Sequence, residues 1–375
     1  MKVLVTGADG FVGKNLQLHL AERKDVEVVC FTREHLVAQL PEMLDDVTFV
    51  FHLAGINRPQ DPAEFTAGNI DLTQALCAAV AGVVSETGRK VPVLFSSSTQ
   101  AANDNLYGAS KRAAEDALFS LQRQNGVPVH VFRLPNVFGK WCKPNYNSAV
   151  ATFCHNIAHD LPIKINDPAA PLTLIYVDDV LQSFIDLMDG ADAALDANGF
   201  AVVAPQFTTT VGEVARLIQS FKDSRNTLLT ERVGTGLVRA LYATYVSYLP
   251  PEAVTYSVPM YGDSRGVFAE MLKTPDCGQF SYFTAHPGVT RGGHYHHSKT
   301  EKFLVINGQA RFKFRHMYTG EAFELNTSGE KAEIVETMPG WTHDITNIGS
   351  DVMIVMLWAN ELFDRQRPDT FACQL

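Results

Sequence analysis

The pattern of apolar residues changes once along the chain, and this change restricts the fold more than any other feature. Over the first two hundred residues, short apolar runs alternate with segments of helical pattern, as expected for a doubly wound α/β parallel sheet with crossover helices. After residue 250 the runs are strand-like and broken by Gly, Asn and Thr, which predicts an all-β barrel or sandwich. Because Pro250 and Pro251 stop the preceding helical pattern, we expect domains at residues 1–250 and 251–375.

Charge and composition exclude several classes of partner. The chain has 31 basic and 41 acidic residues and a formal net charge of -10, so we expect no nucleic acid partner. It contains no run of 18 apolar residues, so we expect no membrane-spanning segment and no membrane partner. The cysteines form no C-x-x-C pair, which favours reduced, buried thiols and a cytoplasmic location. They are Cys30, Cys77, Cys142, Cys154, Cys277 and Cys373.

A glycine-rich turn follows the first expected strand, KVLVT. Gly7, Gly10 and Gly13 have the spacing G-x-x-G-x-x-G at the start of a helical pattern, and Phe11 and Val12 lie inside the motif. Such a turn brings backbone N–H groups and the positive end of a helix to a pyrophosphate, so it predicts a Rossmann-type dinucleotide site. A plain glycine-rich turn is the alternative.

The second expected strand, VEVVCF, ends just before Arg33. At this position an NAD enzyme has a carboxylate for the ribose hydroxyls, whereas an NADP enzyme has a cation for the 2′-phosphate. Arg33 therefore favours NADPH. Glu34 beside it leaves open that Arg33 is a solvated loop charge.

Tyr107 and Lys111 are four residues apart at the start of an expected helix, so they share one face of it. The strand VPVLFSSS ends a few residues upstream at Ser98, which places hydroxyl groups beside the phenol. A lysine ammonium lowers the phenol pKa from about 10 towards neutrality. Tyr107 is then suited to give a proton to a ketone oxygen while hydride reaches the carbon.

Together these residues resemble the extended short-chain dehydrogenase/reductase family, which acts largely on nucleotide sugars. The resemblance implies that Ser98 is the third catalytic hydroxyl, that Asn69 is a structural helper, and that the strand end HLAG lines the cofactor. The cofactor residues of that strand end are Leu53, Ala54 and Gly55.

Two positions depart from the patterns of that family. Members usually have H-x-A-A where this chain has HLAG, so Gly55 differs. Members that dehydrate sugars have an Asp-Glu pair just after the catalytic hydroxyl, whereas this chain has Thr99 and Gln100. The chain therefore lacks the acid and base that a dehydratase needs.

The densest histidine cluster lies in the all-β half. Residues 288–308 match the first cupin motif at its fixed positions, among them His294, His296 and Glu301. Strand alternation turns residues i and i+2 to the same face, so both imidazoles point into one barrel mouth. The second cupin motif supplies another histidine, which "MPGWTHDITN" offers as His343.

Three imidazoles and a carboxylate suit Zn²⁺ or another first-row divalent ion. We therefore expect a metal site in a cupin barrel, with surface histidines near a charged turn as the alternative. His297 faces the other side of its strand and is expected to be a bystander. Pro339 stands directly before Gly340, one residue later than in the family pattern, which predicts a shifted turn ahead of His343.

The same strand also resembles sugar-nucleotide 3,5-epimerases of the cupin-like class. In this interpretation Arg291 grips a phosphate and His294 removes a proton from the sugar. A metal-bound imidazole cannot easily be a base as well, because its lone pair is occupied. The sequence leaves both interpretations open, and the four-residue match favours metal binding.

The order of the two halves resembles the CapF family of bifunctional capsular-polysaccharide enzymes over essentially the whole chain. The most specific stretches are "GKWCKPNYNS" at 139–148, residues 57–59, the cupin strand and the terminal "NELFDRQRPDTF". The resemblance implies two steps on a UDP-linked 2-acetamido-2,6-dideoxy-4-hexulose, the second of which uses NADPH. C3 epimerisation in the cupin domain precedes C4-ketone reduction to UDP-N-acetyl-6-deoxy-L-talosamine, on the route to UDP-N-acetyl-L-fucosamine. A homodimer is also implied.

Chemistry supports that order, because the C4 ketone acidifies the C3 proton and reduction then traps the product. Asn145, Tyr146 and Asn147 lie in a polar loop after the strand VPVHVFRL and are candidate contacts to the nucleotide sugar, with a structural loop as the alternative.

Two other functions remain open. One is an NAD-dependent UDP-sugar 4-epimerase with a structural cupin module, which would oxidise no NADPH overall. The other is a non-catalytic sugar-binding or assembly protein, which any turnover would exclude.

Overall fold

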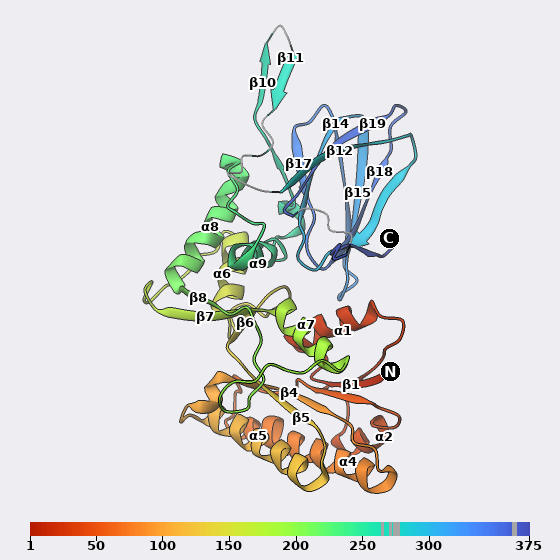
Figure 1. The fold of residues 1–375 in the computed structure, drawn as a ribbon. Helices are drawn as coiled ribbons and strands as arrows, with labels where there is room; N and C mark the ends of the chain where they lie inside the picture. Colours follow the sequence, from red (N-terminus) through yellow and green to blue (C-terminus); the bar gives the residue numbers. More distant parts are fainter. Residues whose placement is uncertain (264–265, 270–271, 273–277, 362–365) are drawn as a thin grey trace. The chain divides into compact units, whose positions relative to one another are not determined.

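The computed structural model describes residues 1–263, 266–269, 272, 278–361 and 366–375 (Figure 1). Cys277 and residues 362–365 of the terminal stretch lie outside the described residues. The chain forms two compact units that interleave along the sequence. The first unit comprises Met1–Phe138 and Leu172–Thr208, and the second comprises Gly139–Pro171 and Thr209–Leu375.

The first unit contains a five-stranded parallel sheet in the order β2-β1-β3-β4-β5. This confirms the predicted Rossmann-type parallel sheet. Because the strand order reverses beside β1, the carboxyl ends of β1 and β3 meet at a switch point, where such folds bind ligands. The strands are β1 (Lys2–Thr6), β2 (Glu27–Phe31), β3 (Phe49–His52), β4 (Val93–Ser98) and β5 (Val129–Leu134).

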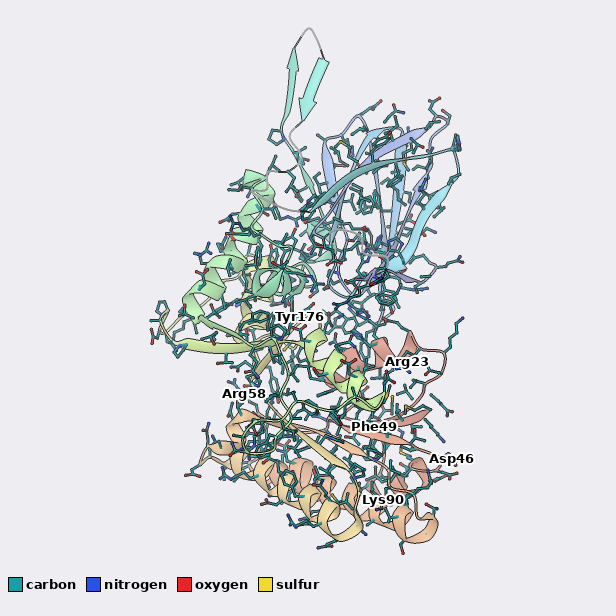
Figure 2. All side chains as sticks on the ribbon, viewed as in Figure 1. Arg23, Asp46, Phe49, Arg58, Lys90 and Tyr176 are labelled. Carbon is teal, nitrogen blue, oxygen red and sulfur yellow. The ribbon has the colours of Figure 1, made fainter. Side chains whose placement is uncertain are left out.

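Helices cover both faces of this sheet, with α2, α4 and α5 on one face and α1 and α7 on the other (Figure 1). Val93 and Leu118 belong to the core beneath the first group. On the other face, Phe184 of α7 packs edge-on against Phe132 of β5, and Phe49, labelled in Figure 2, is buried. The helical elements are α1 (Phe11–Ala21), η1 (Val37–Gln39), α2 (Leu40–Met43), α3 (Ala63–Phe65), η2 (Thr66–Asp71), α4 (Leu72–Thr87), η3 (Thr99–Ala102), α5 (Leu106–Asn125) and α7 (Val177–Met188).

The apolar run LTLIYV at residues 172–177, which follows the same alternating pattern, forms a strand outside the main sheet. It is β7 (Pro171–Tyr176), which pairs in parallel with β6 (Asn136–Phe138) in a three-stranded sheet completed by β8 (Phe207–Thr210). Pro135 separates β6 from β5 and cannot donate a ladder hydrogen bond, so the chain leaves the main sheet there.

The stretch Ala63–Thr87 is long and apolar enough to cross a membrane by length and composition alone. A third of its most apolar window, 33%, is buried inside the structure. Core helices of soluble proteins pass the same test, so this helix is weak evidence for a membrane partner.

The second unit contains two five-stranded sheets, in the orders β12-β19-β14-β17-β9 and β16-β15-β18-β13-β20, and a hairpin of β10 and β11. Its pairings are antiparallel, which confirms the predicted all-β half. Buried Phe303, Phe312 and Phe314 contribute to its core. The strands are β9 (Thr255–Ser257), β10 (Met260–Asp263), β11 (Gly266–Ala269), β12 (Gln279–Ala285), β13 (Thr290–Tyr295), β14 (Glu301–Asn307), β15 (Gln309–His316), β16 (Ala322–Ser328), β17 (Glu333–Glu336), β18 (Trp341–Asn347), β19 (Met353–Ala359) and β20 (Phe371–Ala372).

The described residues of the second unit also form four helical elements, namely α6 (Ala149–Ala158), α8 (Val211–Thr227), α9 (Gly236–Val246) and η4 (Pro251–Ala253). A buried charge cluster links α8 and α9 to the strands: Glu336 of β17 bonds to Lys302 of β14, to Arg225 of α8 at 2.5 Å and to Tyr242 of α9 at 3.1 Å. The compact units therefore do not divide at residue 250. The domain boundary predicted at residue 250 stays a prediction, and a fragment that begins at 251 would lack Arg225 and Tyr242.

Candidate active sites

The glycine turn after β1 has no room for side chains. Gly7 has φ +68°, and a Cβ there would lie 2.6 Å from the backbone N of Ala54 after β3. A Cβ on Gly13 would lie 2.3 Å from the carbonyl oxygen of Gly7. Gly10 caps α1, whose first residues, Phe11 and Val12, are half-buried. Bare backbone thus surrounds a helix N-terminus, which fits the pyrophosphate of a dinucleotide.

A buried hydrogen-bond chain fixes the end of β3, just before the predicted cofactor residues Leu53, Ala54 and Gly55. The Thr73 hydroxyl donates to the Asn69 carbonyl at 2.6 Å, so the Nε2–H of His52 must be the donor to Thr73 at 2.8 Å. The Nδ1 of His52 then accepts from Thr6 Oγ1 at 2.7 Å. Burial lowers the His52 pKa to about 3, and the nearby Lys111 charge acts in the same direction. His52 is therefore a neutral structural group.

Ser98, Tyr107 and Lys111 belong to the carboxyl end of β4 and the first turns of α5. Lys111 is buried, and its Nζ donates to the Ser96 carbonyl at 2.8 Å. Ser98 Oγ accepts the N–H of Gln100 at 3.2 Å, and Tyr107 is half-buried. Tyr107 and Lys111 thus share one face of α5 next to the carboxyl end of β4, and a phenol and an ammonium so placed are suited to giving a proton to a carbonyl oxygen.

Gly55 lies beside Asn69 and Lys111. A Cβ on Gly55 would lie 3.3 Å from Asn69 Oδ1, a tight contact, and 3.5 Å from Lys111 Nζ, an ordinary one, so the structure gives no strong reason for glycine at this position. Asn69 comes from the π-helical turn Thr66–Asp71 and clamps Ile56, accepting its N–H at 2.7 Å and donating to its carbonyl at 2.9 Å. Asn69 also donates to Ser110 Oγ at 2.8 Å, which attaches this turn to α5.

Glu115 is a buried residue of this site that the sequence analysis missed. It lies one turn after Lys111 on α5, accepts a hydrogen bond from Ser97 Oγ, and accepts two from Arg133 of β5 at 3.0 and 2.6 Å. The sequence contained a signal for it, since Glu115 follows Lys111 by four residues on the same helix face and can therefore balance the lysine charge.

Burial of Lys111 makes stability depend on pH. Burial lowers its pKa from 10.5 to about 7, with the Glu115 charge opposing this shift. Between these pH values the unfolded chain binds more protons, so raising the pH stabilises the folded cofactor-free protein by up to about 1.4 kcal/mol per pH unit. Methionine at this position has no proton to lose. We therefore expect the unfolding free energy of Lys111→Met minus that of wild type, both measured by urea denaturation, to fall from pH 7 to pH 10.

The matched control for this prediction is Lys90→Met, because Lys90, labelled in Figure 2, is exposed. Its difference from wild type should not follow the pH dependence seen for Lys111→Met. A Lys111→Met difference that is constant between pH 7 and pH 10 would contradict a depressed lysine pKa.

The second unit brings together the four predicted metal ligands. One ligand atom from each of His294, His296, Glu301 and His343 lies within 4.8 Å of the others. The Nε2 atoms of the three histidines lie 3.9, 3.1 and 3.4 Å from Glu301 Oε2, in that order. His297 is not in this group.

Local backbone geometry explains how two strands deliver these ligands. Gly292 and Gly293 both have positive φ, at +94° and +73°, and form a bulge in β13 that shifts the register before His294. His294 then pairs directly with His343 of β18. The shift expected from Pro339 therefore does not displace His343.

The charges of the cluster fit a divalent cation. Burial lowers the pKa of His343 to about 4, so its imidazole is neutral near pH 7. Neither ring nitrogen of buried His343 has a hydrogen-bond partner among the described residues. Burial acts to raise the Glu301 pKa, but the His296 charge and the surrounding imidazoles outweigh it and hold that pKa well below its usual range. A carboxylate and imidazole nitrogens are the donors that Zn²⁺ takes.

The predicted substrate contacts lie in the second unit as well. Arg291 is exposed on β13, donates to the Thr284 carbonyl at 2.8 Å and lies over the Phe283 ring. Asn145, Tyr146 and Asn147 are exposed or half-buried in the loop before α6. Their roles in substrate binding remain predictions.

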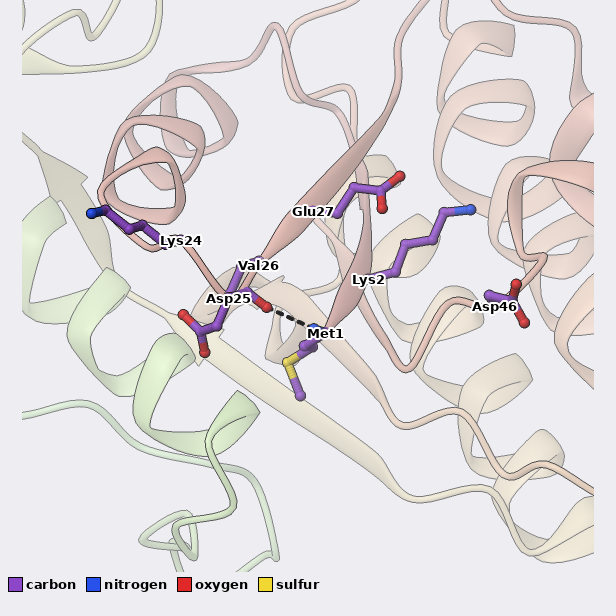
Figure 3. Close-up of a pocket in the computed structure, with 7 residues that line it drawn as sticks. All are labelled: Met1, Lys2, Lys24, Asp25, Val26, Glu27 and Asp46. Carbon is purple, nitrogen blue, oxygen red and sulfur yellow. Dashed lines mark hydrogen bonds between the residues drawn. The ribbon is translucent and has the colours of Figure 1, made fainter.

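A hollow on the first unit lies at the amino ends of the parallel strands, whereas the glycine turn follows the carboxyl end of β1. Figure 3 shows the residues that line this hollow. It is formed at the amino ends of β1 and β2, where the Met1 amino group donates to the Asp25 carbonyl at 2.6 Å. Its charged side chains have both signs. It contains neither the glycine turn nor the Ser98, Tyr107 and Lys111 set.

Two family models match separate parts of the chain. The family described as the NAD dependent epimerase/dehydratase family matches residues 3–200, and the one described as polysaccharide biosynthesis C-terminal domain matches residues 261–371. The chain belongs to the NAD dependent epimerase/dehydratase family, and its second half carries the polysaccharide biosynthesis domain.

Within that family it is a CapF-like protein. It is 62% identical over 375 residues to the UDP-2-acetamido-2,6-beta-L-arabino-hexul-4-ose reductase of Pseudomonas aeruginosa, covering 100% of this chain and 99% of the relative. It is 39% identical to the crystal structure of the capsular polysaccharide assembling protein CapF from Staphylococcus aureus, with a TM-score of 0.67 and 100% of both chains covered.

A more distant likeness concerns the fold alone. The UDP-glucuronic acid 4-epimerase from Bacillus cereus, solved in complex with NAD, is 17% identical and has a TM-score of 0.51. The match covers 59% of this chain and 84% of the epimerase.

Proposed function

We propose that the chain acts on a UDP-linked 2-acetamido-2,6-dideoxy-4-hexulose, inverting C3 in the barrel and reducing the C4 ketone with NADPH at the parallel sheet. The observation that carries the reductase step is buried Lys111 beside Tyr107 and Ser98 at the carboxyl end of β4. The 62% identity to a hexul-4-ose reductase supports a 4-keto sugar as substrate. We keep the cytoplasmic location and the homodimer as parts of the proposal.

In the reduction, the nicotinamide supplies a hydride to C4 when NADPH is bound. Tyr107 gives its phenolic proton to the C4 oxygen, so the carbonyl gains one hydride and one proton and becomes an alcohol. Lys111 stabilises the phenolate that remains, and Ser98 holds the carbonyl oxygen by a hydrogen bond. The glycine turn holds the pyrophosphate, and the end of β3 lines the cofactor.

The epimerisation uses the acidity that the C4 ketone confers on the C3 proton. A base removes this proton, and a proton returns to the opposite face of C3, so no net change in oxidation state occurs. A divalent ion held by His294, His296, Glu301 and His343 would supply Lewis-acid polarisation of a carbonyl group. The alternative, in which His294 is the base and Arg291 grips a phosphate, remains open.

We predict that NADPH is preferred over NADH. Arg33 is exposed two residues beyond the end of β2, where it can meet a 2′-phosphate. Arg33→Ala should lower kcat/KM for NADPH about 10- to 100-fold, the value of a hydrogen bond to a charged group, and leave NADH nearly unchanged. Steady-state kinetics with both cofactors measures this.

The matched control is Arg123→Ala, which removes an exposed arginine near the end of α5. A wild-type preference for NADH would refute the cofactor assignment. Retention of the full NADPH preference in Arg33→Ala, with Arg123→Ala behaving as wild type, would refute the role of Arg33.

A further inference from the structure

The C-terminal segment pairs with β13, the strand that carries His294 and ends just before His296. In β20, Ala372 pairs with His294 and Phe371 pairs with Tyr295 of β13. The N–H of Cys373 donates to the Gly293 carbonyl at 2.8 Å. The C-terminal segment is therefore the edge strand that covers the bulge before His294.

Three residues ahead of Ala372, Asp369 holds the turn between His296 on one side and Glu301 on the other. Its carboxylate accepts three consecutive backbone N–H groups and one hydroxyl, which makes the turn an anion-binding nest. The donors are the N–H groups of His297 at 2.8 Å, Ser298 at 2.9 Å and Lys299 at 2.7 Å, and Ser298 Oγ at 3.0 Å.

The same segment orients the side chain of His296. The backbone carbonyl of Asp369 lies 2.5 Å from His296 Nδ1. A carbonyl can only accept, so Nδ1 carries a hydrogen and Nε2 is the nitrogen that faces the cluster, 3.1 Å from Glu301 Oε2. A metal-binding imidazole commonly has such an outer partner, which fixes its tautomer and ring orientation.

The neighbour of Asp369 acts on the carboxylate ligand through Lys299. Lys299 Nζ donates to Thr370 Oγ1 at 3.1 Å and lies 3.7 Å from Glu301 Oε1. The other oxygen of Glu301, Oε2, faces the three imidazoles. The two residues 369 and 370 thus influence the orientation of two of the four candidate ligands.

We propose that Asp369 is a positioning residue for the metal site of the barrel. By binding the 297–299 turn it fixes the separation and orientation of His296 and Glu301, so that the ligands are organised before the ion enters. The proposal rests on the metal site proposed above. Because Asp369 binds the turn that joins two ligands, its effect is expected on metal affinity.

Titration of metal-free protein with Co²⁺ tests this, because bound Co²⁺ is seen directly in its visible absorption. Asp369→Ala removes the acceptor of four hydrogen bonds, and we expect Co²⁺ affinity to fall about 10- to 100-fold, as is typical when an outer partner of a metal ligand is lost. Asp369→Asn retains one acceptor oxygen and should lose less. His296→Ala, which removes a ligand, should bind least.

Asp351→Ala is the matched control, because it removes an exposed carboxylate from the same unit. Unchanged Co²⁺ affinity and spectrum in both Asp369 variants would overturn the proposal, and the Asn variant decides if the Ala variant does not fold. Reduced affinity in Asp351→Ala to the same degree would also overturn it. A wild-type chain that binds no Co²⁺ would instead refute the metal site itself, before any Asp369 variant is compared.

Discussion

Replacing Tyr107 by phenylalanine is expected to slow NADPH oxidation by the 4-keto sugar about 10²- to 10⁴-fold, the usual cost of losing a general acid. The ring remains, so packing against Phe65, whose centroid lies 6.0 Å away, is retained. Without the phenol, the residue at position 107 donates no proton to the C4 oxygen while C4 receives the hydride. Single-turnover consumption of NADPH at 340 nm measures the effect on the chemical step.

The same variant should still exchange the C3 proton of the 4-keto sugar with solvent, because that exchange needs only the ketone and the barrel site. Tyr107 belongs to the first unit and the histidine cluster to the second. Tyr282→Phe, at an exposed tyrosine of the second unit, is the control and should leave both activities unchanged. If folded Tyr107→Phe lost C3 exchange, the barrel would not be the epimerase and a structural barrel module would explain the chain better.

Replacing His343 by alanine should abolish metal binding and reduce C3 exchange at least about 100-fold, the lower range for losing a group that activates a proton transfer. His343 is buried, and its Nε2 lies 3.4 Å from Glu301 Oε2, so its loss opens one side of the cluster. NADPH oxidation with a supplied C3-inverted 4-keto sugar should continue. Metal analysis of remetallated protein should give about one ion per chain for wild type.

His294→Ala separates the two interpretations of the barrel. A metal ligand and a base both predict loss of C3 exchange, but only a ligand predicts loss of metal. His286→Ala removes an exposed histidine of the same unit and is the control. Loss of exchange with metal content unchanged would identify His294 as the base, and retained exchange would exclude it from the epimerase site.

Much of the fold could be predicted because periodicity reports burial directly. The run KVLVT became β1 and VPVLFSSS became β4, since fully buried parallel strands need continuous apolar residues. The departure of LTLIYV from the main sheet was not predictable, because an apolar run does not specify its neighbour. No feature of the sequence indicated that residues 139–171 belong to the second compact unit. Contacts such as Arg225 with Glu336 join residues far apart in sequence, and no local pattern records them.

The candidate sites likewise contain residues that sequence could predict and residues that it could not. Tyr107 with Lys111, and His294 with His296, have short spacings that a helix or a strand converts into proximity, so sequence could predict them. His343 required a second motif, and the structure brings it to the others through the pairing of β13 with β18. Asp369 is 72 residues from His297 and has no motif of its own. Its role follows only from the fold of the C-terminal segment.

The central claim is that one chain inverts C3 and reduces C4 of the same sugar. NMR of the product formed from the UDP-linked 4-keto sugar and NADPH in D₂O tests it most directly. We predict deuterium on C3, inverted configuration at that carbon, and protium from NADPH on C4. A reduced product with protium at C3 and unchanged configuration there would refute the bifunctional assignment.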